Sequence, residues 1–162
     1  MTAEFSLRQM LPTDESRLKE IAALSFSRLM GFFAVHSLFS EAGQVLVMEV
    51  HGTVVGFAKL IDFQVVGSKF GCVLWIAVHP DFRRKGVANA LTTGGIRRLK
   101  HDSAKAVFAS AQRQNTVVLT VLSRSGFRRI GFLELRQLFG WRVFQFYRSI
   151  WLAPGEVVLI HY

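Results

Sequence analysis

The segment from residue 73 to residue 91 has the features of a phosphate-binding loop. An apolar run typical of a buried strand, residues 73–78, is followed by His79-Pro80-Asp81-Phe82 and then by Arg83-Arg84-Lys85-Gly86-Val87-Ala88. We expect this loop to open a helix whose first backbone N–H groups lack acceptors and carry the positive end of the helix dipole. Such an N-terminus binds phosphate, and Gly86 would let the backbone approach the ligand closely.

An exposed basic turn between an ordinary strand and helix is the alternative interpretation. Three consecutive cations, Arg83, Arg84 and Lys85, would then lie beside a helix N-terminus, where their charge opposes the dipole. A phosphate ligand removes this conflict, so the sequence favours the phosphate-binding interpretation.

The same segment resembles the acyl-coenzyme A loop of the GNAT superfamily of N-acetyltransferases. The family pattern is Arg or Gln, two variable residues, Gly, one variable residue and then Gly or Ala, and Arg83, Gly86 and Ala88 meet it. The family's asparagine before a helix that ends in Gly-Phe is matched by Asn115 and Gly126-Phe127. The resemblance implies acetyl-coenzyme A (acetyl-CoA) as cosubstrate. It would be bound by backbone N–H groups of a splayed strand (Ile76, Ala77, Val78) and by Arg83, Arg84, Lys85, Gly86, Val87, Ala88, Asn89 and Asn115.

The resemblance also implies acetyl transfer to a primary amine by direct attack in a ternary complex, the amine being a small molecule, a lysine or a protein N-terminus. A lysine-like ammonium has a pKa near about 10.4 and must lose its proton, while the leaving thiolate benefits from a proton donor. Leu122 stands where many members carry a tyrosine donor, and Trp75 lies on the strand where many carry a carboxylate. The remaining candidates for proton transfer are Glu49, His79 and Tyr147, with Asp62, Ser123, Ser125 and solvent as alternatives.

Length and composition predict a single globular domain over residues 1–162. Of its 162 residues, 51% are hydrophobic and 19% are charged, which is typical of a folded chain with one core. The single cysteine, Cys72, supplies neither a disulfide framework nor a metal-ligand set, so we expect no metal and a cytoplasmic location. The apolar runs are too often interrupted to predict a membrane span.

The net charge of +9 is unevenly distributed along the chain. Residues 1–80 hold six Lys and Arg against seven Asp and Glu, a charge of −1, whereas residues 81–162 hold fourteen against four, a charge of +10. This asymmetry indicates an anionic ligand or partner for the second half. The phosphates of CoA would bind part of these basic residues, and nucleic acid or an anionic membrane surface could bind the others.

Periodicity and turn residues predict elements in the order β, α, α, β, β, β, α, β, α, β, β. This order matches the GNAT arrangement, so the resemblance implies a mixed α/β (α+β) fold, a largely antiparallel twisted sheet of about seven strands flanked by about four helices. A helix should begin at residues 13–14, and a second helix should place Leu29, Phe32, Phe33 and His36 on one face. Hairpin turns are predicted at 51–52 and 67–69. The apolar tail should pack on its own sheet or across a homodimer interface. We expect strands near 5–7, 45–50, 54–61, 72–78, 106–110, 132–138 and 143–152, and the other helices over 29–39, 86–100 and 116–124.

Two other classes of function remain open. Leu122 and Trp75 motivate a catalytically silent GNAT fold that only binds acyl-CoA. The basic second half motivates a nucleic-acid-binding module, but the chain has no recognition-helix pattern, no RNP-like aromatic motif and no basic run longer than three residues. Nucleic acid is therefore not the favoured partner.

Overall fold

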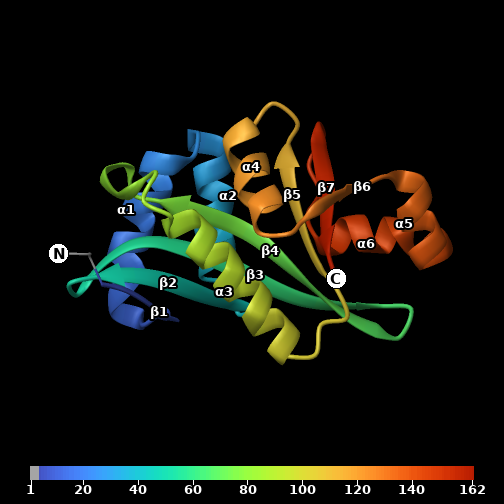
Figure 1. The fold of residues 1–162 in the computed structure, drawn as a ribbon, viewed down its shortest axis with the longest axis horizontal. Helices are drawn as coiled ribbons and strands as arrows, with labels where there is room; N and C mark the ends of the chain where they lie inside the picture. Colours follow the sequence, from blue (N-terminus) through green and yellow to red (C-terminus); the bar gives the residue numbers. More distant parts are fainter. Residues whose placement is uncertain (1–3) are drawn as a thin grey trace. The chain divides into compact units, whose positions relative to one another are not determined.

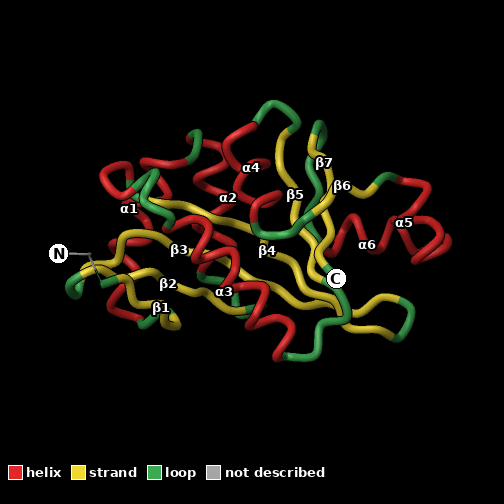
Figure 2. Tube along the Cα trace, in the orientation of Figure 1, coloured by secondary structure: helices red, strands yellow, loops and turns green. Residues whose placement is uncertain are grey.

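The structure, a computed structural model, describes residues 4–162. In this range seven strands form one sheet in the order β1-β2-β3-β4-β5-β7-β6, accompanied by six α-helices (Figures 1 and 2). The strands are β1 (Phe5–Gln9), β2 (Gln44–Val50), β3 (Thr53–Val65), β4 (Ser68–Val78), β5 (Val107–Gln112), β6 (Arg128–Ile130) and β7 (Glu156–His161). The helices are α1 (Glu15–Ser25), α2 (Arg28–Leu38), α3 (Val87–His101), α4 (Thr116–Arg124), α5 (Phe132–Phe139) and α6 (Val143–Ser149), with short 3-10 helices η1 (Pro12–Asp14), η2 (Pro80–Phe82) and η3 (Gly140–Arg142).

The sheet is mixed and largely antiparallel, which confirms the predicted fold class. Strands β4 and β5 run parallel, whereas the pairs β1–β2, β2–β3, β5–β7 and β6–β7 are antiparallel. The residues fall into two compact units. The first contains the residues up to Leu60 and Trp75–Gly95, and the second contains Ile61–Leu74 and Ile96–Tyr162.

In the first unit, strands β2 and β3 have helices on both faces (Figure 1). Leu18 of α1 packs with Val47 of β2 and Phe57 of β3 in one buried cluster. The neighbouring residue Gly56 faces the other side, where a Cβ atom would lie 3.1 Å from Leu91 of α3. Successive residues of a strand point to opposite faces, so the pair Gly56-Phe57 separates the two helical layers.

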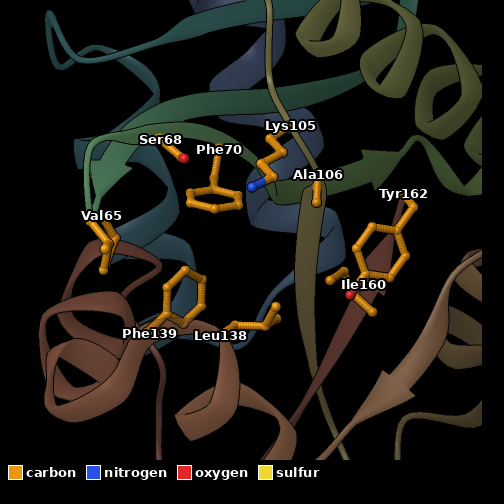
Figure 3. A pocket seen from close by; sticks show the side chains of 10 residues that line it. Val65, Ser68, Phe70, Lys105, Ala106, Leu138, Phe139, Ile160 and Tyr162 are labelled. Atoms are coloured by element: carbon orange, nitrogen blue, oxygen red, sulfur yellow. The ribbon is translucent and has the colours of Figure 1, made fainter.

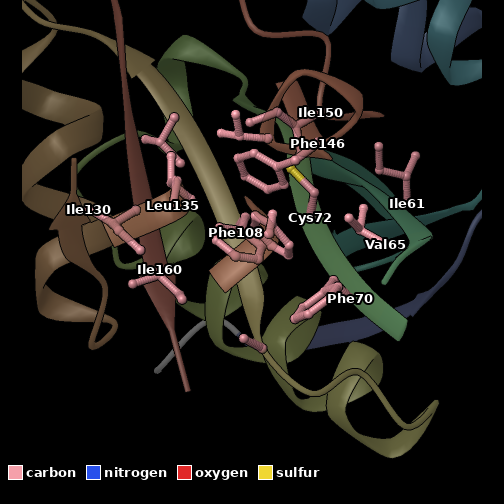
Figure 4. Close-up of a cluster of buried hydrophobic side chains, with 14 residues drawn as sticks. Ile61, Val65, Phe70, Cys72, Phe108, Ile130, Leu135, Phe146, Ile150 and Ile160 are labelled. Carbon is pink, nitrogen blue, oxygen red and sulfur yellow. The ribbon is translucent and has the colours of Figure 1, made fainter. Parts of the chain in front are cut away.

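The second unit has its own aromatic core beside β5 and β7 (Figure 4). The ring of Phe146 lies 4.6 Å from that of Phe108, centroid to centroid, and 4.8 Å from that of Phe139. Contacts between aromatic rings at these separations stabilise a core beyond the burial of their area. Cys72 belongs to the same cluster, and its burial raises the pKa of the thiol, so this cysteine is a core residue.

The strands predicted at 132–138 and 143–152 are wrong, because these residues form α5 and α6. The aromatic and β-branched content suggested strands, but the buried side chains recur every three or four residues, which is the period of a helix. They are Leu135, Phe139, Val143, Phe146 and Ile150. The chain therefore has six α-helices in the described range instead of about four.

The apolar tail forms the strand that completes the sheet. Strand β7 lies between β5 and β6, with Ala109 opposite Leu159 and Ile130 opposite Val158. Its residues Val158, Leu159 and Ile160 are buried. The expectation that the tail packs on its own sheet is confirmed.

Two tight turns connect the strands around β3. The predicted turn at His51-Gly52 is present, with φ values of 48° and 77°. The next turn lies at Val66-Gly67, with φ values of 53° and 72°, one residue before the predicted position. Two positive φ angles are typical of a type I′ turn, which favours Asn-Gly. Val66 is β-branched, so its left-handed backbone is strained.

Replacing Val66 with asparagine should raise the free energy of unfolding by about 1 kcal/mol, because asparagine tolerates positive φ and valine does not. Urea denaturation of the two proteins measures the difference. The control is Val66→Thr, which keeps the β-branch and should change stability by less than about 0.5 kcal/mol. Equal stabilisation by both substitutions would contradict the strain explanation.

Candidate functional site

The loop between β4 and α3 presents backbone donors at the start of a helix. The amide of Ala90 donates to the carbonyl of Gly86 at 3.0 Å, which is the first helical hydrogen bond of α3. The N–H groups of the residues just before Ala90 have no carbonyl acceptor within the helix, because those acceptors would lie four residues earlier. The start of α3 therefore has the donor arrangement that binds an anion.

Two residues of this loop have left-handed backbones. Arg84 has a φ of 61° and Gly86 a φ of 82°. A Cβ atom on Gly86 would have no other atom within 4 Å, so the space in front of this glycine is open. Arg84, Lys85 and Gly86 are all exposed, and the Nζ atom of Lys85 lies 5.1 Å from the centroid of the Phe82 ring. The loop offers exposed cations beside an accessible backbone.

Arg83 is turned back onto the protein and braces the loop. Its Nε atom donates to the carbonyl of Val78 at 3.0 Å, and its guanidinium also donates to the carbonyl of Leu24 and the hydroxyl of Ser25, both at 3.3 Å. These bonds connect the end of α1 with the end of β4. Sequence reasoning missed Ser25, because nothing in its local pattern marks it as a partner of the loop.

The backbone direction at the end of β4 follows from one hydrogen bond. The amide of His79 donates to the carbonyl of Val55 in β3 at 2.8 Å. Backbone groups of alternate residues point to the same side of a strand, so Ala77 also faces β3. Its carbonyl oxygen would lie 2.9 Å from a Cβ atom on Gly56, which agrees with this direction. The amides of Ile76 and Val78 therefore point away from β3.

His79 joins β4 to η2 and caps that short helix. Its Nδ1 atom accepts from the amide of Asp81 at 3.3 Å, and the carboxylate of Asp81 lies 3.7 Å from the same nitrogen. Nδ1 can accept the amide proton only when it carries no hydrogen, and Nε2 of the neutral ring is then the N–H donor. The carboxylate contact belongs to a ring that carries a hydrogen on Nδ1, and in the neutral tautomer of that ring Nε2 can accept a proton from a ligand.

Glu49 belongs to a network of ion pairs in the first unit. Arg8 contacts the Oε2 atom of Glu49 at 2.8 Å and binds both carboxylate oxygens of Asp14, at 2.7 and 3.0 Å. The Arg8 guanidinium holds the pKa of the Asp14 carboxyl below its usual range. Because Glu49 shares this arginine, one of its oxygens is already engaged.

The predicted site residues of the second unit serve the local structure. The Oδ1 atom of Asn115 accepts from the amide of Val118 at 3.3 Å and caps α4. Leu122 is fully buried in α4, and Tyr147 of α6 is partly buried, with its ring 5.7 Å from that of Phe146. Burial raises the pKa of the Tyr147 hydroxyl, so Tyr147 stays protonated near neutral pH.

Trp75 carries a buried donor without an acceptor in the described part of the chain. Its Nε1 atom is inaccessible to solvent and has no hydrogen-bond partner. The indole packs edge-on against Phe26, which follows α1, with ring centroids 5.4 Å apart. An unpaired buried N–H group makes the folding free energy less favourable. Trp75 directly precedes Ile76 in β4.

The chain also has an apolar cavity of 190 Å³ in the second unit (Figure 3). Phe70, Phe139 and Ile160 line it, with Lys105 and Tyr162 at its polar side. None of the candidate site residues contributes to this lining. Among residues 4–162, no three His, Cys, Asp or Glu side chains are grouped to hold a metal ion, and no helix is long and apolar enough to span a membrane.

Comparison with known families shows which family this chain belongs to. Residues 9–127 match the model of the Acetyltransferase (GNAT) family. The chain belongs to the GNAT family. The resemblance seen in Arg83, Gly86 and Ala88 is therefore confirmed, and the match spans the loop, α3 and α4.

Several proteins with acetyltransferase names are similar to this chain. Mycothiol acetyltransferase of Propionibacterium freudenreichii subsp. shermanii is 33% identical over 91 residues, which cover 55% of this chain and 28% of that protein. A GNAT-family protein from Desulfovibrio desulfuricans has a TM-score of 0.73 at 15% identity and 98% coverage of both chains. The paiA N-acetyltransferase of Thermoplasma acidophilum, in complex with coenzyme A, has a TM-score of 0.68 at 13% identity, covering 97% of this chain and 98% of that one. The two structures share the fold.

Lys59 is a buried cation in this GNAT chain that sequence reasoning did not single out. It lies on β3 opposite Val45, is fully buried, and donates from Nζ to the carbonyl of Ser40 at 3.4 Å. Burial lowers the pKa of its ammonium because the charged form loses its hydration. A lone lysine within the apolar run 54–61 was the available signal.

Replacing Lys59 with methionine should raise the free energy of unfolding at neutral pH by about 1 kcal/mol, because it removes a desolvated charge. The folded state binds this proton less tightly than the unfolded state, whose pKa is near 10.5. The parent should therefore gain stability, relative to Lys59→Met, as pH rises towards that value. Urea denaturation between neutral and alkaline pH measures this trend. The exposed control Lys105→Met should leave this pH dependence of the unfolding free energy unchanged. An equal change of the pH dependence in both variants would contradict its assignment to Lys59.

Proposed function

We propose that this chain is an acetyl-CoA-dependent N-acetyltransferase that binds its cosubstrate at the loop from Arg83 to Asn89. The observation that carries the proposal is the open left-handed glycine, Gly86, at the start of α3, beside the exposed Arg84 and Lys85. The GNAT family match and the coenzyme A complex of the Thermoplasma acidophilum protein support it.

The residues of the loop fit a pyrophosphate group. Backbone N–H groups at Gly86, Val87 and Ala88 would donate to phosphate oxygens, and the charges of Arg84 and Lys85 would be offset by the phosphates. Arg83 acts as a positioning residue in this proposal, because its guanidinium already binds Val78, Leu24 and Ser25.

Backbone groups of β4 would bind the arm that carries the acetyl group. The amides of Ile76 and Val78 point away from β3 and can donate to a ligand, whereas Ala77 faces β3. When bound, acetyl-CoA supplies a thioester whose carbonyl is open to attack by an amine. A backbone donor near that carbonyl oxygen would stabilise the negative charge that develops on it.

His79, Glu49 and Tyr147 are the candidate proton-transfer groups. His79 directly follows β4 and keeps Nε2 available, whereas Glu49 shares Arg8 with Asp14 and Tyr147 packs on the aromatic core. We therefore propose His79 as the first choice. The acceptor is a primary amine, on a small molecule, a lysine or a protein N-terminus, and the buried donor of Trp75 beside Phe26 is suited to a polar atom of that acceptor.

A catalytically silent acyl-CoA-binding protein is the second candidate function. It is favoured by the buried Leu122, which replaces the tyrosine donor of many family members, and by Trp75. A thiol-release assay with acetyl-CoA and a panel of primary amines separates the two candidates. Binding of coenzyme A without turnover of any amine would favour the silent protein.

Gly86→Val should abolish coenzyme A binding while the protein stays folded. A β-branched side chain would fill the open space before the loop and block the close approach of phosphate. Isothermal titration with coenzyme A measures the affinity, and circular dichroism measures the fold.

The matched control for this substitution is Gly67→Val. Gly67 also has positive φ, 72°, and open space around its Cβ position, but it lies in the β3–β4 turn. Both variants should lose similar stability, and only Gly86→Val should lose affinity. Unchanged affinity in a folded Gly86→Val protein would refute the loop assignment.

His79→Asn should lower kcat by about 10² to 10⁴ and remove one limb of the pH–rate profile, because the imidazole exchanges a proton during the reaction. Asparagine can still cap η2 through its side-chain oxygen, so the loop should keep its structure. Steady-state kinetics across pH, with an amine that the parent acetylates, provide the measurement. An unchanged profile would exclude His79, and Glu49→Gln and Tyr147→Phe would then be compared.

A further inference from the structure

The α5–α6 segment has an aromatic stripe that faces solvent. Trp141, Phe144 and Trp151 are 74%, 61% and 50% exposed, and Arg148 lies between the last two. Phe144 and Arg148, four residues apart, lie on one side of α6, while Trp141 precedes the helix in η3 and Trp151 follows it with a φ of 54°. The opposite side buries Val143, Phe146 and Ile150 in the core of the second unit, so the exposed stripe is not needed for the packing of α6.

Large side chains of this kind are rarely exposed together without a partner. Leu133 of α5, at 73% exposure, adds an aliphatic side chain to the same segment. In the ribbon, α5 and α6 project beside the end of β6 (Figure 1). The exposed apolar groups therefore lie on helices that the core holds in place from one side only.

The segment is also strongly basic. Residues 128–151 contain five arginines and one acidic residue, Glu134. Glu134 pairs with Arg128 at 3.0 Å, which leaves Arg142 and Arg148 without a carboxylate partner among the described residues. The guanidinium carbon of Arg136 lies 4.4 Å from the centroid of the Trp141 ring. Arginines and exposed aromatic rings are thus interleaved on one surface.

We propose that this surface, the α5–α6 outer face formed by Arg136, Trp141, Phe144, Arg148 and Trp151, binds the surface of an anionic phospholipid bilayer. The aromatic rings would enter the headgroup region while the arginines meet lipid phosphates, as basic amphipathic helices do. Tryptophan is suited to this depth, since its ring is apolar and its N–H group stays near water.

Charge and side-chain type favour a membrane over other occupants. A second copy of the same face would bring arginines against arginines, which opposes self-association. Single-stranded nucleic acid would use the arginines and stack on the aromatic rings, but the exposed Leu133 offers no ring for stacking. An anionic bilayer accepts the aliphatic, aromatic and basic groups together. The inference does not depend on the proposed acetyltransferase function.

Vesicle flotation tests the proposal with the full chain. The protein should bind vesicles of phosphatidylcholine mixed with phosphatidylglycerol and bind vesicles of phosphatidylcholine alone at least about tenfold more weakly. Binding to the mixed vesicles should weaken as salt is raised, because the ionic part is screened. Equal binding to both vesicle types, or none to the mixed ones, would overturn the proposal.

Two pairs of variants assign the binding to the α5–α6 outer face. Phe144→Ser should weaken binding about tenfold, while the control Phe32→Ser, at a residue of α2 that is 68% exposed, should not. Arg148→Glu should weaken binding about fivefold or more, while Arg97→Glu, an equal charge change at an exposed residue of α3, should have a smaller effect. Equal losses in either pair would contradict the assignment to this face.

Tryptophan fluorescence gives a readout that does not depend on folding of the charge variants. Brominated anionic lipids should quench the emission of the parent, and Trp141→Phe combined with Trp151→Phe should remove most of this quenching and leave Trp75. Quenching that persists in the double variant would overturn the proposal. So would an oligonucleotide that binds more tightly than the vesicles and loses affinity in Phe144→Ser, because the face would then bind nucleic acid.

Discussion

The hydrogen bond from the His79 amide to the Val55 carbonyl determines the direction of the backbone groups at the end of β4. It turns Ala77 towards β3 and directs the amides of Ile76 and Val78 away from it. The Val78 carbonyl then accepts from Arg83, which ties the following loop to the end of α1. The start of α3 packs against the neighbouring strand β3, because Gly56 of β3 has no side chain and lets α3 approach.

Two buried charged groups of the first unit, Asp14 and Lys59, differ in the partners that compensate for their lost hydration. Asp14 is buried but receives two hydrogen bonds from Arg8, so its charge is stabilised and its pKa falls. Lys59 is buried with a carbonyl acceptor and without a carboxylate partner among residues 4–162, so its charged form is disfavoured and its pKa falls as well. A lowered pKa means that the folded state favours the charged form of Asp14 but the neutral form of Lys59, because loss of a proton charges an acid and neutralises a base. At neutral pH the charge of Asp14 is therefore stabilised by folding, whereas the charge of Lys59 is destabilised by it.

Membership in the GNAT family agrees with the phosphate-binding loop and leaves the proton transfers to be assigned by this chain's own residues. Many members use a tyrosine and a carboxylate for the proton transfers. In this chain these positions are occupied by Leu122, which is buried in α4, and Trp75, which packs on Phe26, and neither side chain has a phenol or a carboxylate. One ring nitrogen of His79 contacts Asp81, and His79 directly follows β4, which is why we propose it as the first candidate for proton transfer. In the proposed reaction, backbone donors of β4 would stabilise the developing negative charge, and their positions do not depend on side-chain type.

The sequence alone determined the features that rest on local chemistry. The loop of Arg83, Gly86 and Ala88, the turn at His51-Gly52 and the cap of α4 by Asn115 each follow from residues close together in the chain. Their physical basis is backbone conformation and hydrogen bonding over a few residues, which neighbouring residue types specify.

The tertiary structure decided what depends on distant partners. Residue types in 132–149 are suited to strands, yet the segment forms α5, η3 and α6, and its buried side chains at helical spacing share one core with Phe108. The predicted apolar face of α2 is exposed at Phe32, because the smaller Gly31 and Ala34 face the core instead. Arg83 was expected to meet a ligand, but Leu24 and Ser25, almost sixty residues earlier, offer it acceptors. Such contacts join residues far apart in the chain, and the pattern around each residue contains no information about its partner.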